Sequence, residues 1–184
     1  MLQGKRPREA VTSSFPKVVA AAATQPGHDT SDTIASLRLV CGSRDPEVTR
    51  FVAGPWSDRQ KHRAFVESRT LASYPAGMGY WTIRFRSNPT DFLGWILLIP
   101  TDAVGPEIEI GWRLPRNAWG YSIATEAGRP VLQHAFATLE VAEVVAEIDA
   151  RNFGSISTRA TRPPSGRKFV NADDSRVHRP TAPQ

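Results

Sequence analysis

Apolar and polar residues follow two distinct periods along the middle of the chain. Apolar residues alternate with polar ones over residues 81–85, run continuously over 92–99, and alternate again over 107–114. Successive side chains of a strand face opposite sides, so these stretches predict three strands. Residues 87–91 (Ser-Asn-Pro-Thr-Asp) have the composition of a turn, and the first two strands therefore form an antiparallel hairpin.

Apolar residues recur every three or four positions over 64–71 and 123–139, which is the spacing of an amphipathic helix. Ser57 and Asp58 have the chemistry of a helix start for the first of these, and it should end before Pro75. Asp45, followed by Pro46, predicts another, short helix that ends near residue 51.

Two further short segments, 37–40 and 144–150, are apolar enough to be strands. The resulting order is strand, helices, three antiparallel strands, helix and strand. It predicts an α+β fold, a mixed and mostly antiparallel sheet flanked by helices with one parallel crossover. Gly128 and Pro130 fall inside the last helix, which should therefore be kinked or shortened, because Pro removes a hydrogen bond and Gly lowers helix propensity.

The two ends of the chain have a different composition from its middle. Residues 1–32 and 159–184 are rich in Pro and small or polar residues and show no sustained periodicity. Such segments bury too little apolar surface to offset their ordering entropy. The sequence thus predicts a disordered N-terminal extension (1–32), one domain (33–158) and a disordered basic tail rich in Pro and Arg (159–184).

The chain has 184 residues, of which 40% are apolar and 22% charged, with a net charge of +5. This charge lies at the ends: residues 151–184 hold seven basic and two acidic residues, whereas 31–150 hold twelve and fourteen. A nucleic-acid-binding domain would carry its basic residues on the folded surface, so a nucleic-acid partner is not expected. A weaker alternative makes the tail a nucleic-acid arm, with these cations: Arg159, Arg162, Arg167, Lys168, Arg176 and Arg179.

The single cysteine, Cys41, excludes an internal disulfide, and the four His show no metal-ligand spacing. We therefore expect no metal and a reducing, cytoplasmic location. No apolar run approaches the roughly 20 residues of a membrane helix, so no membrane partner is expected.

The junction between the strand that ends at Leu114 and the helix that begins near Ile123 is the most informative segment. A helix that starts after a loop of small residues presents unpaired amides and the positive end of its dipole, which together bind anions such as phosphates. Gly120 would let the backbone approach such a ligand closely. A lone glycine in a turn is the ordinary alternative.

Residues 119–127 read Trp-Gly-Tyr-Ser-Ile-Ala-Thr-Glu-Ala and share six of nine positions with Trp-Gly-x-Gly-Tyr-Ala-Thr-Glu-Ala. That pattern resembles the acetyl-CoA pyrophosphate loop of the GNAT N-acetyltransferase superfamily, in particular its ribosomal-protein N-terminal acetyltransferase branch. Other segments similar to that branch follow in order: Asp-Pro-Glu-Val-x-Arg at 45–50, residues 80–83, residues 109–114, and Asn152 with Ser155. The resemblance covers roughly residues 45–155.

The resemblance implies a transferase that moves an acetyl group from acetyl-CoA to a primary amine, of a protein N-terminus or a small molecule. It also implies that backbone groups of residues 110–114 bind the pantetheine arm, that the loop holds the pyrophosphate, and that Asn152 and Ser155 lie near the arm and the sulfur. The cofactor-binding residues expected are Ile110, Gly111, Trp112, Arg113, Asn117, Trp119, Gly120, Tyr121, Ser122, Ile123, Ala124 and Asn152. For the general base we select Glu109, because its strand borders that site; a solvated strand carboxylate is the alternative. The residue expected at the sulfur, Ser155, completes the catalytic pair.

The sequence departs from the family pattern in ways that favour a second reading. Ser122 replaces the second Gly of the loop, Asn117 stands where Gln or Arg is usual, and the C-terminal strands of the family have no counterpart in the sequence pattern. The alternative to an active enzyme is therefore a degenerate, catalytically impaired protein that retains a CoA-binding fold.

Overall fold

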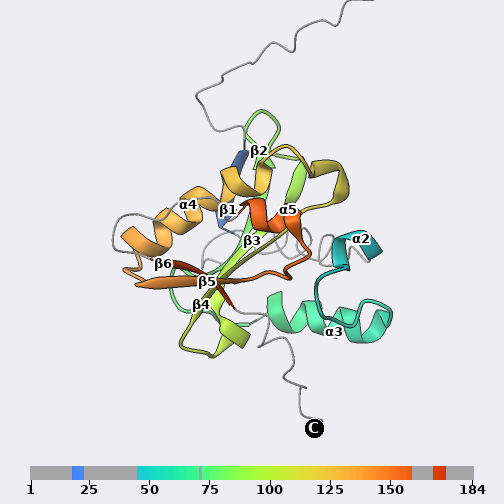
Figure 1. Ribbon diagram of the computed structural model, residues 1–184, viewed down its shortest axis with the longest axis horizontal. Coiled ribbons are helices and arrows are strands. Elements are labelled where there is room, and N and C mark those ends of the chain that lie inside the picture. The colour runs from blue at the N-terminus through green and yellow to red at the C-terminus, as the bar shows by residue number, and fades with distance from the viewer. Residues whose placement is uncertain (1–17, 23–44, 71, 159–167, 173–184) are drawn as a thin grey trace, which may run out of the picture.

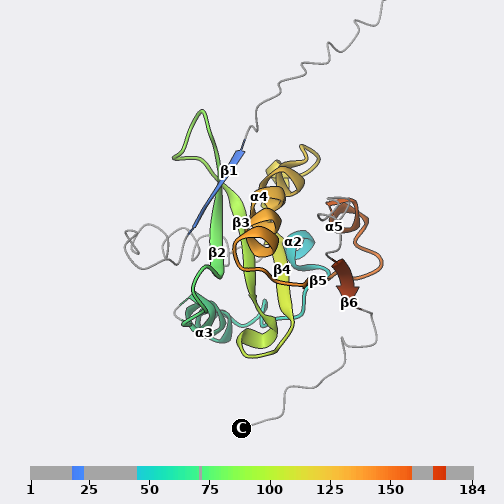
Figure 2. The same ribbon diagram turned by 90° about the vertical axis from the view of Figure 1, so that its left-hand side faces the viewer.

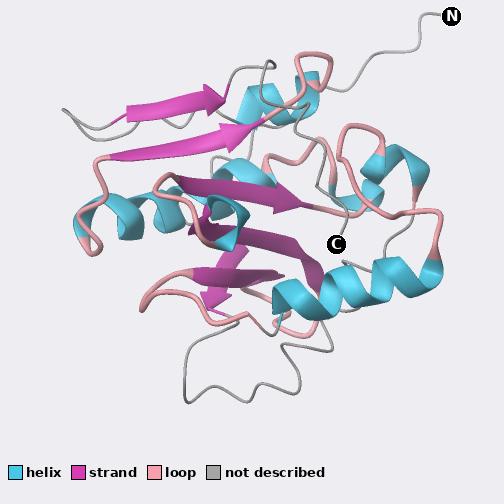
Figure 3. Cartoon of the chain, turned by 90° about the horizontal axis from the view of Figure 1, so that it is seen from below, coloured by secondary structure: helices cyan, strands magenta, loops and turns pink. Residues whose placement is uncertain are grey.

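The computed structural model describes residues 18–22, 45–70, 72–158 and 168–172 (Figure 1). Its strands form one six-stranded sheet in the order β1-β2-β3-β4-β5-β6, which Figure 3 shows as a twisted layer with helices around it. The strands are β1 (Val18–Ala22), β2 (Gly79–Phe85), β3 (Phe92–Pro100), β4 (Ile108–Arg113), β5 (Glu143–Glu147) and β6 (Lys168–Ala172). The helices are α2 (Pro46–Thr49), α3 (Arg59–Thr70), α4 (Ile123–Ala137) and α5 (Phe153–Thr158), with 3-10 turns η1 (Thr101–Ala103) and η2 (Arg116–Ala118).

Strands β1 to β4 pair antiparallel, whereas β5 is parallel to both β4 and β6. The predicted α+β class with a mixed, mostly antiparallel sheet is confirmed. The hairpin of β2 and β3, the strand β4 and the strand β5 all lie where the sequence pattern predicts them. The strand predicted at 37–40 lies outside the described residues.

Two strands were not predicted. β1 lies within residues 1–32 and β6 within residues 159–184, the segments for which the sequence indicated no ordered element. For these two five-residue stretches the prediction was wrong, and so was the expectation that no strand follows β5. Both sit at the edges of the sheet, where pairing with β2 or β5 supplies what their own sequence pattern does not.

The sheet has a buried core on each face, because alternate residues of each strand point to opposite sides. On one face α4 packs against residues that include Ile83, Ile96 and Ile110. On the other face α3 contributes Val66, which packs with Tyr80 and other residues of β2 and β3. Figure 1 shows α4 and α3 on opposite sides of the strands, and in Figure 2 α4 lies in front of β3 and β4. The functional side chains of β4 therefore divide between these two faces.

Both longer helices start where the sequence predicts. The Asp58 carboxylate accepts hydrogen bonds from the amides of Gln60 and Lys61, at 2.9 and 3.0 Å, and so caps α3. α4 runs for 15 residues without interruption, so the predicted shortening is wrong. Pro130 lies on the exposed side of α4, where water can solvate the carbonyl that loses its amide partner.

No helix in the described part of the chain is long and apolar enough to cross a membrane.

Candidate active site

Strands β4 and β5 separate after two residue pairs. Their register contains only Ile108 with Val144 and Glu109 with Val145. Beyond Glu109, β4 keeps its pairing with β3, so only its β5 side loses backbone partners. The two strands thus form a fork, defined here as the opening between residues 110–113 of β4 and 146–147 of β5. The edge of β4 that faces this opening has no register pair with β5, and a strand edge of this kind is suited to bind an amide-containing chain.

The loop that follows β4 leads into α4 at the open end of the fork. Trp119 Nε1 donates a hydrogen bond to the Leu114 carbonyl at 2.9 Å and closes this loop on itself. Gly120 has φ of 79°, and no atom lies within 4 Å of the position that a Cβ would take there. The glycine is therefore required by its backbone conformation, and the space beside it is open for a ligand.

The N-terminus of α4 presents backbone amides at this same point. The first helical hydrogen bond runs from the Glu126 amide to the Ser122 carbonyl at 2.9 Å, so the amides of Ile123, Ala124 and Thr125 precede the helical ladder. Ser122 caps the helix with φ of 58°, a left-handed conformation that a residue with a Cβ seldom adopts. Amides in this position, together with the positive end of the helix dipole, are suited to bind an anion.

Asn152 and Ser155 lie on the other arm, after β5. The Asn152 side-chain oxygen accepts a hydrogen bond from the Ser155 amide at 3.1 Å and so caps α5. Its NH₂ group remains a donor that this cap does not use. Both residues are half-buried, whereas the neighbouring Phe153 is 77% exposed.

Glu109 lies at the base of the fork, on the sheet face that α3 covers. Burial raises the pKa of Glu109, the carboxylates of Glu147 and Asp102 raise it further, and the guanidinium of Arg69 partly offsets these effects. Burial alone would lower the pKa of Arg69, but Tyr80, by its charge and a hydrogen bond, together with Glu109 raises it. A raised pKa makes a carboxylate a stronger proton acceptor, which favours the role of a general base.

The other predicted residues of β4 contribute in different ways. The side chain of Ile110 is buried in the core and that of Trp112 packs against it, so both offer only backbone groups to a ligand. The guanidinium of Arg113 is packed between the rings of Trp56 and Trp95, with Cζ 4.6 and 5.4 Å from their centroids. The side chain of Arg113 therefore packs in the interior of the protein. Gly111 has no side chain to offer a ligand.

In the loop, Asn117 and Tyr121 are exposed, and the side chain of Trp119 is partly exposed. In the structure Glu109 forms the last register pair of β4 with β5, the loop follows the other end of β4, and Asn152 and Ser155 follow β5.

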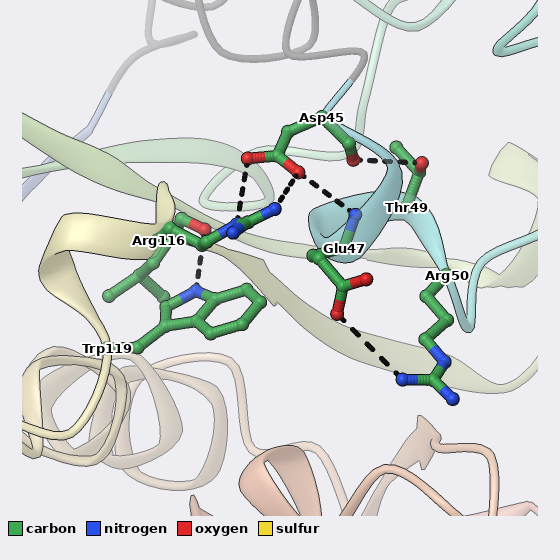
Figure 4. A network of polar contacts seen from close by, with 7 residues as sticks. Asp45, Glu47, Thr49, Arg50, Arg116 and Trp119 are labelled. Carbon is green, nitrogen blue, oxygen red and sulfur yellow. Dashed lines mark hydrogen bonds and ion pairs between the residues drawn. The ribbon is translucent and has the colours of Figure 1, made fainter.

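Sequence reasoning missed Arg116, which lies in η2 just before the loop. Its guanidinium donates to both carboxylate oxygens of Asp45, from Nε at 3.1 Å and from Nη2 at 3.0 Å (Figure 4). The pair holds the pKa of Asp45 below its usual value. The two residues are 71 positions apart, and no local pattern could have joined them.

Among the described residues, no group of three or more His, Cys, Asp or Glu side chains could hold a metal ion.

Residues 29–158 match the family described as the acetyltransferase (GNAT) domain. The chain is 29% identical over 125 residues to FsC-acetyl coenzyme A-N(2)-transacetylase of Aspergillus fumigatus, a match that covers 63% of this chain. It spans about half of that relative, 52% of its length.

Two solved structures share the fold. An acetyltransferase from Agrobacterium tumefaciens has a TM-score of 0.53 at 21% identity, over 83% of this chain and 85% of that one. The spermidine N-acetyltransferase of Vibrio cholerae, solved with CoA and spermine, has a TM-score of 0.57 at 8% identity, over 77% of each chain. The family match spans more than half of the chain and coincides with the fork, the loop and α4, so this protein belongs to the GNAT acetyltransferase family.

Proposed function

We propose that this protein is an acetyl-CoA-dependent N-acetyltransferase that acts on a primary amine. The observation that carries the proposal is the coincidence of two features at one place. From Ile110 to Arg113 the edge of β4 has no register pair with β5, and the amides at the start of α4 follow the end of this strand in the chain. Acetyl-CoA combines an amide-containing arm with a pyrophosphate, so the two features suit its two parts.

In this proposal the β4 backbone binds the pantetheine arm, which directs the thioester toward the base of the fork. Gly120 and the amides of Ile123 and Ala124 bind the pyrophosphate. Asn152 donates its free NH₂ to the arm from the second side, and the hydroxyl of Ser155 lies near the sulfur. Holding the arm at both strands limits the orientations of the thioester and converts part of the binding energy into positioning.

Acetyl transfer requires an amine without its proton, because the nitrogen lone pair attacks the thioester carbon. Glu109 accepts that proton, directly or through a water molecule, and the amine forms an amide as the thiolate leaves. The Ser155 hydroxyl gives the thiolate a hydrogen-bond donor. An α-amino group, with a reference pKa near 8, needs less help from a base than a Lys side chain near 10.4.

The acceptor is a protein N-terminus or a small-molecule amine. The similarity of residues 45–50 and 119–127 to the ribosomal-protein N-terminal acetyltransferase branch supports the first. The similarity to a curated relative whose name describes N(2)-acetyl transfer supports the second. Either acceptor would react as a neutral amine that gives up its proton to Glu109.

A second candidate is a CoA-binding protein with impaired turnover. Ser122 favours it, since its left-handed φ of 58° is strained for a residue other than glycine at the point where phosphate must approach.

Titration calorimetry with acetyl-CoA tests the proposal, followed by a thiol-release assay with amine acceptors. We expect saturable binding, and we expect Gly120→Asp to abolish it, because a carboxylate would occupy the open space beside the amides. Gln133→Glu adds the same charge on the exposed side of α4 and serves as the control. Absence of binding at millimolar acetyl-CoA contradicts both candidates, whereas binding without thiol release favours the impaired one.

A further inference from the structure

Residues 45–51, which include the short helix α2, contact the segments that follow both arms of the fork. Asp45 caps α2, because its Oδ1 accepts a hydrogen bond from the Glu47 amide at 2.9 Å and its carbonyl accepts one from the Thr49 hydroxyl at 3.1 Å (Figure 4). The same carboxylate receives both donors of Arg116, in the segment that leads from β4 into the loop. One side chain thus fixes α2 and ties it to the first arm.

At the other end of residues 45–51, Phe51 contacts the turn that follows the second arm. The guanidinium of Arg151 lies over the Phe51 ring, with Cζ 5.7 Å from its centroid. Arg151 is held in the turn between β5 and α5 by Asp149, through contacts of 2.6 and 2.9 Å. This turn immediately precedes Asn152.

We propose that residues 45–51 form a clamp that holds the two arms of the fork at a fixed separation, with Arg116 as the residue that positions the phosphate-binding loop. This inference rests on the proposed function. Arg116 does not touch the phosphates in this arrangement. Its guanidinium is engaged in two bonds to Asp45, and it fixes the backbone that leads to Gly120.

Electrostatics and positioning predict opposite results for one substitution. Asp45→Asn keeps a good helix cap, since Asn and Asp are equivalent there, but it removes the negative charge and the bidentate partner of Arg116. If Arg116 only supplied charge to the phosphates, freeing it from Asp45 would strengthen acetyl-CoA binding. If it positions the loop, the same substitution weakens binding.

We expect Asp45→Asn and Arg116→Lys each to raise the Kd and the KM for acetyl-CoA about tenfold, while kcat at saturation stays within twofold. Lys keeps the charge of Arg116 but cannot make the paired bonds. The double variant should be no worse than either single one, because both remove the same contact. The melting temperature should change little, since an exposed ion pair adds little to the stability of a protein.

Arg63→Lys is the matched control, because Arg63 makes an exposed ion pair with Glu67 at 3.0 Å on α3 and should leave the Kd unchanged when substituted. Hydrogen exchange of residues 116–122 without any ligand provides the second readout, and it should become faster in Asp45→Asn and Arg116→Lys. Tighter binding by Asp45→Asn, or unchanged exchange in both variants, would overturn the clamp. If wild type binds no acetyl-CoA, the proposed function fails, while the exchange measurement still decides whether the clamp exists.

Discussion

Glu109, the proposed general base, has a raised pKa. Its carboxyl is partly buried on β4, and burial is the main reason that its pKa is raised, with the like charge of Glu147 second. Nearby Arg69 opposes these effects without cancelling them. A raised carboxyl pKa places the proton acceptor closer to the working pH of an amine acetylation.

We predict that Glu109→Gln lowers kcat about 10²- to 10⁴-fold, the usual contribution of a general base. In wild type, kcat/KM should fall as the pH drops through the raised pKa of Glu109, because the protonated carboxyl accepts no proton. The variant should lose that limb of the profile. Steady-state rates between pH 5 and 9 measure both, and a variant that keeps the wild-type limb would assign it to another group.

The raised pKa of Glu109 also affects stability. It lowers the free energy of unfolding at neutral pH, whereas a carboxylate in an ordinary ion pair raises it. The folded state holds the proton of Glu109 more tightly than the unfolded chain does. Ionised Glu109 therefore lowers the free energy of unfolding as the pH rises above the pKa that Glu109 has in the unfolded chain. Glu109→Gln should therefore raise the free energy of unfolding at neutral pH, and this gain should disappear in acid. Urea titrations at pH 7 and pH 4 report it, independently of activity.

At the level of elements, most of the fold follows from local patterns. The alternation over residues 81–85 and 108–114 and the helical spacing after Ile123 produce β2, β4 and α4, because each element buries one face. The edge strands β1 and β6 were not predicted, because their pairing with β2 and β5, rather than a pattern in their own sequence, defines them. Gly120 could be selected from sequence because its conformation is local, whereas the pair of Asp45 and Arg116 depends on tertiary structure.

The start of α4 offers a prediction at this scale. Ser122→Gly should tighten acetyl-CoA binding several-fold and raise the melting temperature slightly, because it removes a left-handed strain of about 1 kcal/mol at the helix cap. Glu140 has a similar φ of 55° but follows the opposite end of α4. Glu140→Gly is therefore the control for backbone relief alone and should leave the affinity unchanged. Unaltered affinity in Ser122→Gly would show that the strain does not reach the phosphate site.

Across the whole molecule, the sheet joins segments from the beginning and the end of the described chain. β5 is the second arm of the fork, and its outer edge pairs with β6 along all five residues from Glu143 to Glu147. On its other edge β5 shares only two residue pairs with β4. Most of the backbone pairing that holds this arm therefore comes from residues 168–172.

The pairing of β5 with β6 makes residues 159–184 important for the site, although none of them is proposed to bind acetyl-CoA. Deleting residues 159–184 should lower the melting temperature by at least about 5 °C and weaken acetyl-CoA binding, because β5 becomes an edge strand held only by its two residue pairs with β4. Deleting only residues 173–184 keeps β6 and removes two Asp and two Arg, so the formal net charge does not change, and it should change neither quantity. Thermal melts and calorimetry of the two truncated chains show whether the effect requires the segment that contains β6. Should the longer deletion leave both the melting temperature and the affinity at wild-type values, β6 would have no part in holding the fork.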